Sequence, residues 1–364
     1  MTDFDLEFDE LTRWMEATTP KAAPDDLLDG ALARVTSTPQ RPGWLVPERW
    51  TLVETTLRLG RAPRTVTVLL VLAALLLLLL GALTLGGVGS HLFPPKLPIA
   101  FASTRDGASQ IYLMAADGSS QAAITSGSDN EDPVFSPDGA HMIVVSKRGG
   151  TAQLFLMNAD GSNATQLTNL PHAVSHAAWS PDGRRIAYHV DTTDSGCYEV
   201  FVMNADGSGQ TQLTPDTAGC NWAPDWSRDG SKILFSTTRD GLFDLYTMRP
   251  DGTLTAPLES QPNANDAFAR YSPDGKQIAF TTWDSSLDAT SAEVVVENVD
   301  GTGRHQVTNN AFEDGYPAWS PDGRHLAFTS RRDGSWEVYT ANPDGSNPVR
   351  LTTSPADDLD PSWR

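Results

Sequence analysis

Positive charge is scarce in this chain. Its 364 residues contain 26 Lys and Arg against 46 Asp and Glu, so the formal net charge at pH 7 is −20. Nucleic-acid binding depends on clustered cations that displace counterions from phosphates. The acidic balance therefore excludes nucleic acid as an expected partner.

Recognisable catalytic motifs are lacking as well. The sequence contains no G-x-S-x-G nucleophile elbow, no P-loop, no dinucleotide fingerprint and no H-E-x-x-H metal motif. His172, His176 and His189 could together ligate zinc, but loop histidines are common and no carboxylate at a suitable spacing accompanies them. We expect a protein that is not an enzyme and has no cofactor or metal.

Charge is missing altogether from residues 65–90. The apolar run Val66–Val88 within them meets the roughly 20 residues needed to cross a hydrocarbon core. A cleaved signal peptide would lie at the extreme N-terminus, whereas 64 residues precede this run. We therefore expect a retained, single-pass transmembrane helix.

The cations beside this run predict its orientation, because Lys and Arg concentrate on the cytoplasmic side of a membrane helix. Only Lys96 follows the run closely, whereas four arginines precede it: Arg49, Arg58, Arg61 and Arg64. We expect residues 1–64 in the cytoplasm, 91–97 as a linker, and 98–364 outside the cytoplasmic membrane.

Residues 1–64 are too short to form a large core. Two stretches, Asp3–Ala17 and Asp25–Val35, have apolar residues at helical spacing. Such a segment could bind a cytosolic protein, as membrane-bound anti-sigma factors do, or serve only as part of the anchor.

The remaining chain is a repeat. A turn S-P-D-G occurs at 136–139, 180–183, 272–275 and 320–323, with S-R-D-G at 227–230. A second turn, x-D-G, recurs between these and ends at Gly118, Gly161, Gly207, Gly252, Gly301 and Gly345. Two interleaved markers with one period of about 45 residues indicate a repeat architecture.

Each period contains four short β signals: an aromatic residue before S-P-D-G, an apolar run after it, a third run before x-D-G, and a fourth that ends in a Leu-Thr-like pair. Four strands per period are typical of a propeller blade. The repeats begin with a second-strand sequence, Ile99–Ser103, and end with a first-strand sequence, Asp360–Trp363. We expect an all-β, six-bladed propeller with one blade shared between the chain ends.

These motifs (D-x-x-P-x-W-S-P-D-G, I-A-F-x-S, I-Y-x-M-x-A-D-G-S and L-T) resemble the WD-like repeat of the TolB six-bladed propeller over residues 98–364. The resemblance implies the fold. Propellers of this kind serve as protein-binding platforms, sugar-binding modules and accessory domains of peptidases, so it implies a binding role without naming the ligand.

One repeat position suggests a ligand site. The residue five places before each blade aromatic is an acid or amide in five blades: Asn130, Asn221, Asp266, Asp314 and Asp358, with Val174 in the sixth. These side chains either cap strands and join neighbouring blades, or form an acidic channel mouth. Such a mouth would bind a cation or a basic peptide, with negative charge aiding the encounter.

Aromatic residues in the loops of the same face could anchor a partner, because aromatics dominate binding hot spots. The candidates are Trp222, Trp283 and Tyr316, together with Phe312. The expected ligand at this channel mouth is an envelope protein, a peptide or a glycan.

The only two cysteines, Cys197 and Cys220, fall on the same face of adjacent blades. In an exported domain such a pair favours a disulfide. The alternative is two buried thiols.

The topology predicts a protease-protection result. In spheroplasts, added protease should cleave residues 98–364 and leave residues 1–64 intact until the membrane is permeabilised. Digestion of residues 1–64 from outside would contradict the orientation.

Overall fold

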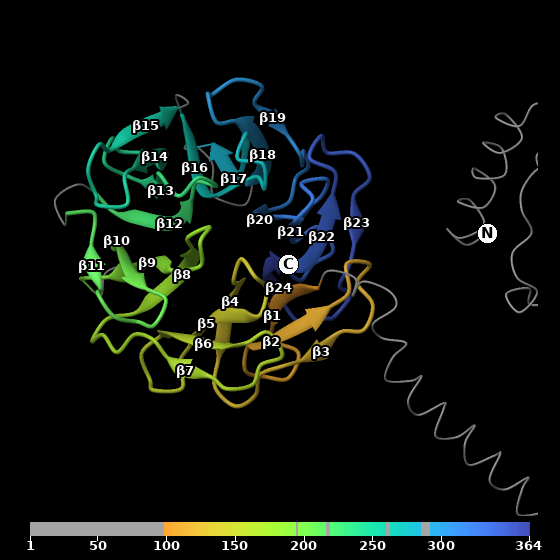
Figure 1. Cartoon of the computed structure of the whole chain (residues 1–364). Coiled ribbons are helices and arrows are strands. Elements are labelled where there is room, and N and C mark those ends of the chain that lie inside the picture. The colour runs from red at the N-terminus through yellow and green to blue at the C-terminus, as the bar shows by residue number, and fades with distance from the viewer. Residues whose placement is uncertain (1–97, 194–195, 216–218, 260–262, 285–291) are drawn as a thin grey trace, which may run out of the picture. The chain divides into compact units, whose positions relative to one another are not determined.

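Short strands separated by Asp-Gly turns pair with their sequence neighbours, and the result is six four-stranded antiparallel sheets around a central channel (Figure 1). The computed structural model describes residues 98–193, 196–215, 219–259, 263–284 and 292–364. The predicted membrane helix and the segment 1–64 lie outside these residues. In the part of the chain that is described, no helix is long and apolar enough to cross a membrane.

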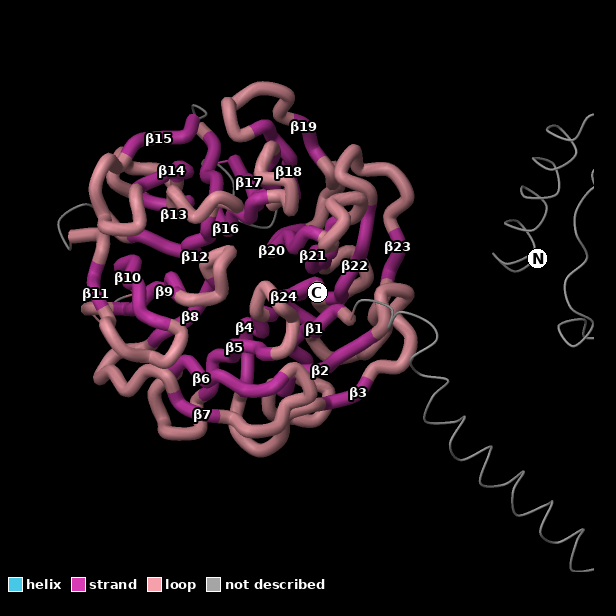
Figure 2. The backbone as a smooth tube through the Cα atoms, viewed as in Figure 1, coloured by secondary structure: helices cyan, strands magenta, loops and turns pink. Residues whose placement is uncertain are grey.

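Every blade contributes one strand of each kind, from the channel to the rim (Figure 2). The first strands are β24 (Asp358–Trp363), β4 (Asn130–Phe135), β8 (Val174–Trp179), β12 (Asn221–Trp226), β16 (Ala264–Tyr271) and β20 (Asp314–Trp319) for blades 1 to 6. The second strands are β1 (Ile99–Ser103), β5 (His141–Ser146), β9 (Arg185–Asp191), β13 (Ile233–Thr237), β17 (Gln277–Asp284) and β21 (Leu326–Ser330).

The outer strands follow the same order. The third strands are β2 (Gln110–Met114), β6 (Gln153–Asn158), β10 (Tyr198–Asn204), β14 (Asp244–Met248), β18 (Glu293–Asn298) and β22 (Glu337–Ala341). The fourth strands are β3 (Ala122–Ala123), β7 (Thr165–Gln166), β11 (Thr211–Gln212), β15 (Ala256–Glu259), β19 (His305–Gln306) and β23 (Val349–Arg350). The six-bladed, all-β prediction is confirmed.

The Leu-Thr pairs differ from expectation, because most lie just after the fourth strand rather than inside it. The reason is that a side-chain hydrogen bond takes the place of the backbone hydrogen bonds between the third and fourth strands. The Leu154 N–H donates to Thr168 Oγ1 at 2.9 Å, and the Val338 N–H donates to Thr352 Oγ1 at 2.9 Å. The threonine thus satisfies a buried donor of the third strand after the backbone pairing has ended.

The core of the ring lies between the blades. Six clusters of buried side chains each join two neighbouring sheets, and together they fill all six interfaces. Trp226 of β12, for example, is 2% exposed and packs with Ala187 of β9 and Phe235 of β13. A single blade could not bury its faces alone, so stability depends on the complete ring.

The C-terminal strand closes that ring. β24 pairs antiparallel with β1, with Ile99 opposite Trp363 and Ser103 opposite Asp358. The predicted sharing of one blade between the chain ends is therefore confirmed. Closure leaves no inner edge strand of blade 1 unpaired.

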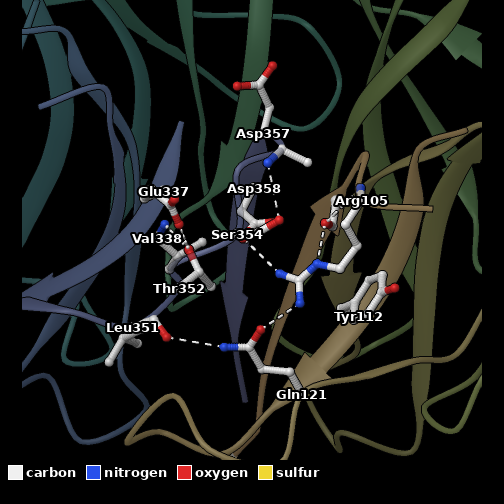
Figure 3. A network of polar contacts seen from close by, with 12 residues as sticks. Arg105, Tyr112, Gln121, Glu337, Val338, Leu351, Thr352, Ser354, Asp357 and Asp358 are labelled. Carbon is white, nitrogen blue, oxygen red and sulfur yellow. Dashed lines mark hydrogen bonds and ion pairs between the residues drawn. The ribbon is translucent and has the colours of Figure 1, made fainter. Parts of the chain in front are cut away.

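A buried ion pair holds this junction. Arg105, just after β1, places Nη2 2.8 Å from Oδ2 of Asp358, whose side chain is fully buried. Its other groups donate to Ser103 Oγ and Gln121 Oε1, both at 2.8 Å, and the guanidinium lies over the Tyr112 ring (Figure 3). Such a fork holds the last strand at a fixed register.

Substitution of Asp358 by Ala should lower the free energy of unfolding by about 3–5 kcal/mol, because it leaves a partly buried guanidinium without its carboxylate. Chemical denaturation measures the loss. Asp314→Ala is the matched control, since Asp314 pairs with Arg332 at 3.0 Å in blade 6. Hydrogen exchange should accelerate in β24 and β1 for the first variant, and in β20 and β21 for the second. Unchanged stability in Asp358→Ala would contradict the role of the pair.

Cys197 and Cys220 form a disulfide in the structure, with their Cα atoms 4.8 Å apart. Cys197 directly precedes β10 of blade 3, and Cys220 directly precedes β12 of blade 4. The bond therefore connects neighbouring blades on the face that carries the loops between second and third strands.

Loss of this bond should reduce the free energy of unfolding by about 3 kcal/mol, given the 23-residue separation. Cys197→Ser, Cys220→Ser and the double variant should all show the same loss in a denaturant titration, because each removes one covalent link. Reductant should lower the wild type to that level and leave the double variant unchanged. Two free thiols by mass spectrometry without reductant would disprove the pairing.

Candidate binding site

The first strands line the channel, and a bulge in each one decides which side chains enter it. The pairing between β4 and β5 shifts between Glu131 and Val134, and equivalent shifts occur in the other blades. The residue three places before each blade aromatic has a positive φ of 46–57°: Asp132, His176, Ala223, Phe268, Tyr316 and Asp360. A bulge that re-aims side chains in this way is common near binding sites.

A cavity of about 370 Å³ occupies the channel. Its lining begins at the bulges, with Asp132, His176 and Asp360, and extends to prolines of the S-P-D-G turns such as Pro137 and Pro321. The cavity therefore extends toward the face of these turns, and of the candidates predicted from the sequence only Tyr316 is in its lining.

Aromatic rings meet at the bulge end of the cavity. The Phe268 and Tyr316 ring centroids lie 4.6 Å apart, and the His176 ring lies 5.4 Å from Phe268 and 6.4 Å from Tyr316. These residues come from blades 5, 6 and 3, so the contact spans the channel. Their rings give the cavity an apolar end.

Two carboxyl groups, those of Asp132 and Asp360, share one wall. Burial, and then the neighbouring Asp132 carboxylate, raise the pKa of Asp360 well above its ordinary value. The His176 N–H donates to Asp132 Oδ2 at 3.2 Å, and His176 Nδ1 lies 3.3 Å from the same oxygen. Burial lowers the pKa of His176, so its ring is neutral at pH 7.

The wall opposite carries both signs of charge. Asp225 Oδ2 accepts a hydrogen bond of 2.7 Å from the Tyr271 N–H, and burial raises the pKa of Asp225. Arg270 lines the cavity nearby, and Arg228 donates to the Ser272 carbonyl at 3.0 Å. Small apolar side chains such as Ala318 also line the cavity. A cavity of this kind suits a ligand with apolar and charged parts.

The acid and amide residues singled out from the repeat do not line the cavity; they are buried inside the blades and bonded there. Arg304 forms a two-pronged contact with Asp266, both bonds at 2.9 Å, and Arg332 binds Asp314 at 3.0 Å. Asn221 donates from Nδ2 to Glu199 of the neighbouring blade at 2.8 Å. Asn130 and Asp358 make equivalent contacts, with Gln110 and Arg105. These are the contacts of the structural alternative left open above.

The candidate aromatics separate into two groups. Tyr316 belongs to the cavity, whereas Trp222 and Trp283 lie outside its lining. Phe243 lies between the two tryptophans, with ring centroids 4.4 Å from Trp222 and 5.6 Å from Trp283. Phe312 is 48% exposed.

One of the three histidines considered as zinc ligands, His189, makes hydrogen bonds through its ring. His189 is 2% exposed, its Nδ1 accepts from the Ala223 N–H at 3.1 Å, and its Nε2 lies 2.6 Å from Ser175 Oγ. Both ring nitrogens are thus engaged. Within residues 98–364, apart from the undescribed gaps, no group of three His, Cys, Asp or Glu could hold a metal ion.

Four charged cavity residues, Asp132, Asp225, Arg270 and Asp360, were not among the sites predicted from the sequence. A signal existed, because the positions three places and one place before the blade aromatic, which hold Asp132 and Asp360, and Asp225 and Arg270, respectively, vary between blades, whereas the position between them is Pro or Ala in every blade. In a repeat protein, the residues that recur maintain the fold, so a position that varies between the repeats is a candidate for a functional role. A prediction that assumes regular alternation of side chains, however, assigns the residues after a β-bulge to the wrong face of the strand.

Known proteins share this architecture. A family model described as the TolB beta propeller domain matches residues 89–217, 165–286 and 268–364. No curated protein matches the chain. Among solved structures, TolB from Acinetobacter baumannii is similar with a TM-score of 0.66 at 18% identity, over 73% of this chain and 66% of that one.

Two further structures show the same ring. A candidate TolB from Agrobacterium tumefaciens has a TM-score of 0.56 at 21% identity, over 72% of this chain and 90% of that one. The nidogen/laminin complex contains a chain with a TM-score of 0.57 at 12% identity, over 73% and 97%. Similarity at these identities shows the fold alone. The family matches, however, cover the chain from residue 89 to its end. The chain therefore belongs to the TolB beta propeller family.

Proposed function

We propose that this protein is a membrane-tethered, non-catalytic propeller that binds a protein or peptide of the cell envelope through its central channel. The observation that carries the proposal is the 370 Å³ cavity, to which first strands from all six blades contribute. The combination of apolar rings, carboxyl groups and arginines supports binding of a polypeptide segment.

Binding rather than catalysis is favoured by the partners of the charged groups in the cavity. Asp225 accepts a backbone N–H, Arg228 donates to carbonyls of the adjacent turn, and Asp132 contacts His176. Among the described residues that line the cavity, no nucleophile is bonded to a base in the way that acyl or glycosyl transfer requires. The similar chain in the nidogen/laminin complex, an assembly of two proteins, is consistent with propellers as protein-binding platforms.

The cellular location is part of the proposal. It depends on the uncharged run Val66–Val88 and on the arginines before it. A short linker, 91–97, would keep the propeller next to the outer surface of the cytoplasmic membrane. The propeller would then meet partners that reach the membrane from outside.

A second candidate function is a transmembrane sensor. Its support is the 64 residues that precede the apolar run and that contain two amphipathic stretches. The propeller would bind an external ligand, and residues 1–64 would regulate a cytosolic protein. A pull-down with residues 1–64 that recovers no specific partner would exclude the sensor.

The channel proposal predicts where a partner can be crosslinked. A photoreactive phenylalanine analogue at Ala318, in the cavity, should give a discrete crosslinked product in native membranes. The same analogue at Val349 should not, because Val349 lies on the outer strand of the same blade and is 52% exposed.

Ala178→Trp supplies the second arm of this experiment, since Ala178 also lines the cavity. The added ring should fill the space and remove the product at position 318, while a Val349→Trp control should retain it. Equal crosslinking from 318 and 349, or a product that survives Ala178→Trp, would contradict binding in the channel.

A further inference from the structure

A row of aromatic side chains lies outside the cavity, over blades 3 to 5. Ring centroids of Tyr198 and Trp222 are 6.1 Å apart, those of Trp222 and Phe243 are 4.4 Å apart, and Trp283 follows Phe243 at 5.6 Å. All four residues are partly exposed. We call Tyr198, Trp222, Phe243 and Trp283 the aromatic arc.

The repeat itself shows that the fold does not need two of these rings, those of Trp222 and Trp283. The position of Trp222 holds Glu131, Ser175, Ala267, Gly315 and Leu359 in the other blades. The position of Trp283 holds Thr104, Lys147, Asp191, Thr238 and Arg331. Because five blades form the same sheet without an aromatic residue at either position, packing of the blade does not explain the tryptophans. Large, half-exposed aromatics in a contiguous row instead favour an interaction surface.

The arc is also held in place. The Cys197–Cys220 disulfide lies directly beside it, since Tyr198 follows Cys197 and Trp222 is two residues after Cys220. The bond therefore fixes the first two rings relative to each other, although they belong to different blades. A rigid row of rings loses little conformational entropy when a ligand binds.

Charge on this face is unevenly distributed. Between their second and third strands, blades 6, 1 and 2 carry five cations: Arg331, Arg332, Arg105, Lys147 and Arg148. The corresponding stretches of blades 3, 4 and 5 carry only Arg239. Arg239 contacts Asn221 inside blade 4, and Arg105, Arg148 and Arg332 are bonded inside their own blades in the same way. The two halves of this face therefore differ by Lys147 and Arg331, which pair with Glu131 and Glu313.

Acidic residues accompany the arc. Asp191 pairs across the sheet with Tyr198, Asp244 follows Phe243, and Asp284 follows Trp283. Burial raises the pKa of Asp244, and the neighbouring Asp240 and Asp266 carboxylates raise it further.

We infer that the aromatic arc is a docking surface for an extended, basic polypeptide segment, whose Lys or Arg side chains contact the ring faces. Cation–π contacts require a positive group against an aromatic face, and the surrounding carboxylates would attract the same positive group. At about 3.3 Å per extended residue, the arc accommodates roughly five residues. This surface is distinct from the cavity, so it goes beyond the proposed channel function.

The test uses the full chain in detergent and a fluorescein-labelled peptide, Arg-Ser-Arg-Ser-Arg-Ser, with Glu-Ser-Glu-Ser-Glu-Ser as the acidic counterpart. Fluorescence anisotropy should show binding of the basic peptide, weaker at high salt because the acidic groups are screened. Trp222→Ala and Trp283→Ala should each weaken it about tenfold. Trp222→Phe, which keeps a ring, should bind nearly as well as the wild type and shows that the site survives substitution.

Trp336→Ala is the matched control. Trp336 holds the position of Phe243 in blade 6 and is partly exposed, but Arg331 of the chain itself lies 5.5 Å from its ring centroid. Its loss should leave affinity unchanged. The inference is overturned if the wild type does not bind the basic peptide, if the acidic peptide binds as tightly, or if Trp336→Ala weakens binding as much as Trp222→Ala. If the basic peptide does not bind and neutral maltohexaose changes the tryptophan fluorescence of the wild type but not of Trp222→Ala, the arc is a glycan surface and the inference is wrong.

Discussion

The pairing of β24 with β1 is the constraint on which the rest of this structure depends. It joins residues about 260 positions apart, so its entropic cost is met only when the whole ring has formed. Because every core cluster lies between two blades, an open ring would expose an interface at each end. The Arg105–Asp358 ion pair secures the junction at a buried point, where a lost partner is costly.

The bulges of the first strands decide which side chains of this ring line its central channel. A positive φ at residues such as Phe268 and Tyr316 costs about 1–3 kcal/mol at each site, and it persists because neighbouring groups hold it. The Phe268 N–H donates to Ser236 of the preceding blade at 3.2 Å, and the Tyr316 N–H donates to Thr281 at 3.1 Å. Hydrogen bonds from these backbone N–H groups to side-chain hydroxyls of the preceding blade thus support the strained positions and leave their own side chains free to vary around the channel.

Departures from the repeat carry the functional information. The aspartates that recur in three blades, Asp266, Asp314 and Asp358, form buried pairs with arginines. Residues that occur in one blade only, such as Trp222, Trp283 and Arg270, lie in the aromatic arc or in the cavity. Much of the acidity of the chain therefore maintains the ring, because these carboxylates are already neutralised inside the blades. The side chains that we propose a partner contacts are those of the cavity and of the aromatic arc.

The sequence by itself determined the strand order, the number of blades, the closure between the chain ends and the face shared by Cys197 and Cys220. These follow from local turn chemistry and from a period repeated six times. Only the tertiary structure decided which side chains enter the channel, since a bulge reverses the alternation between Glu131 and Val134. It also decided that Asp266 meets Arg304 and that Trp222 lies beside Phe243. Such contacts join residues from different strands, and their geometry arises only when the sheets pack into a closed ring.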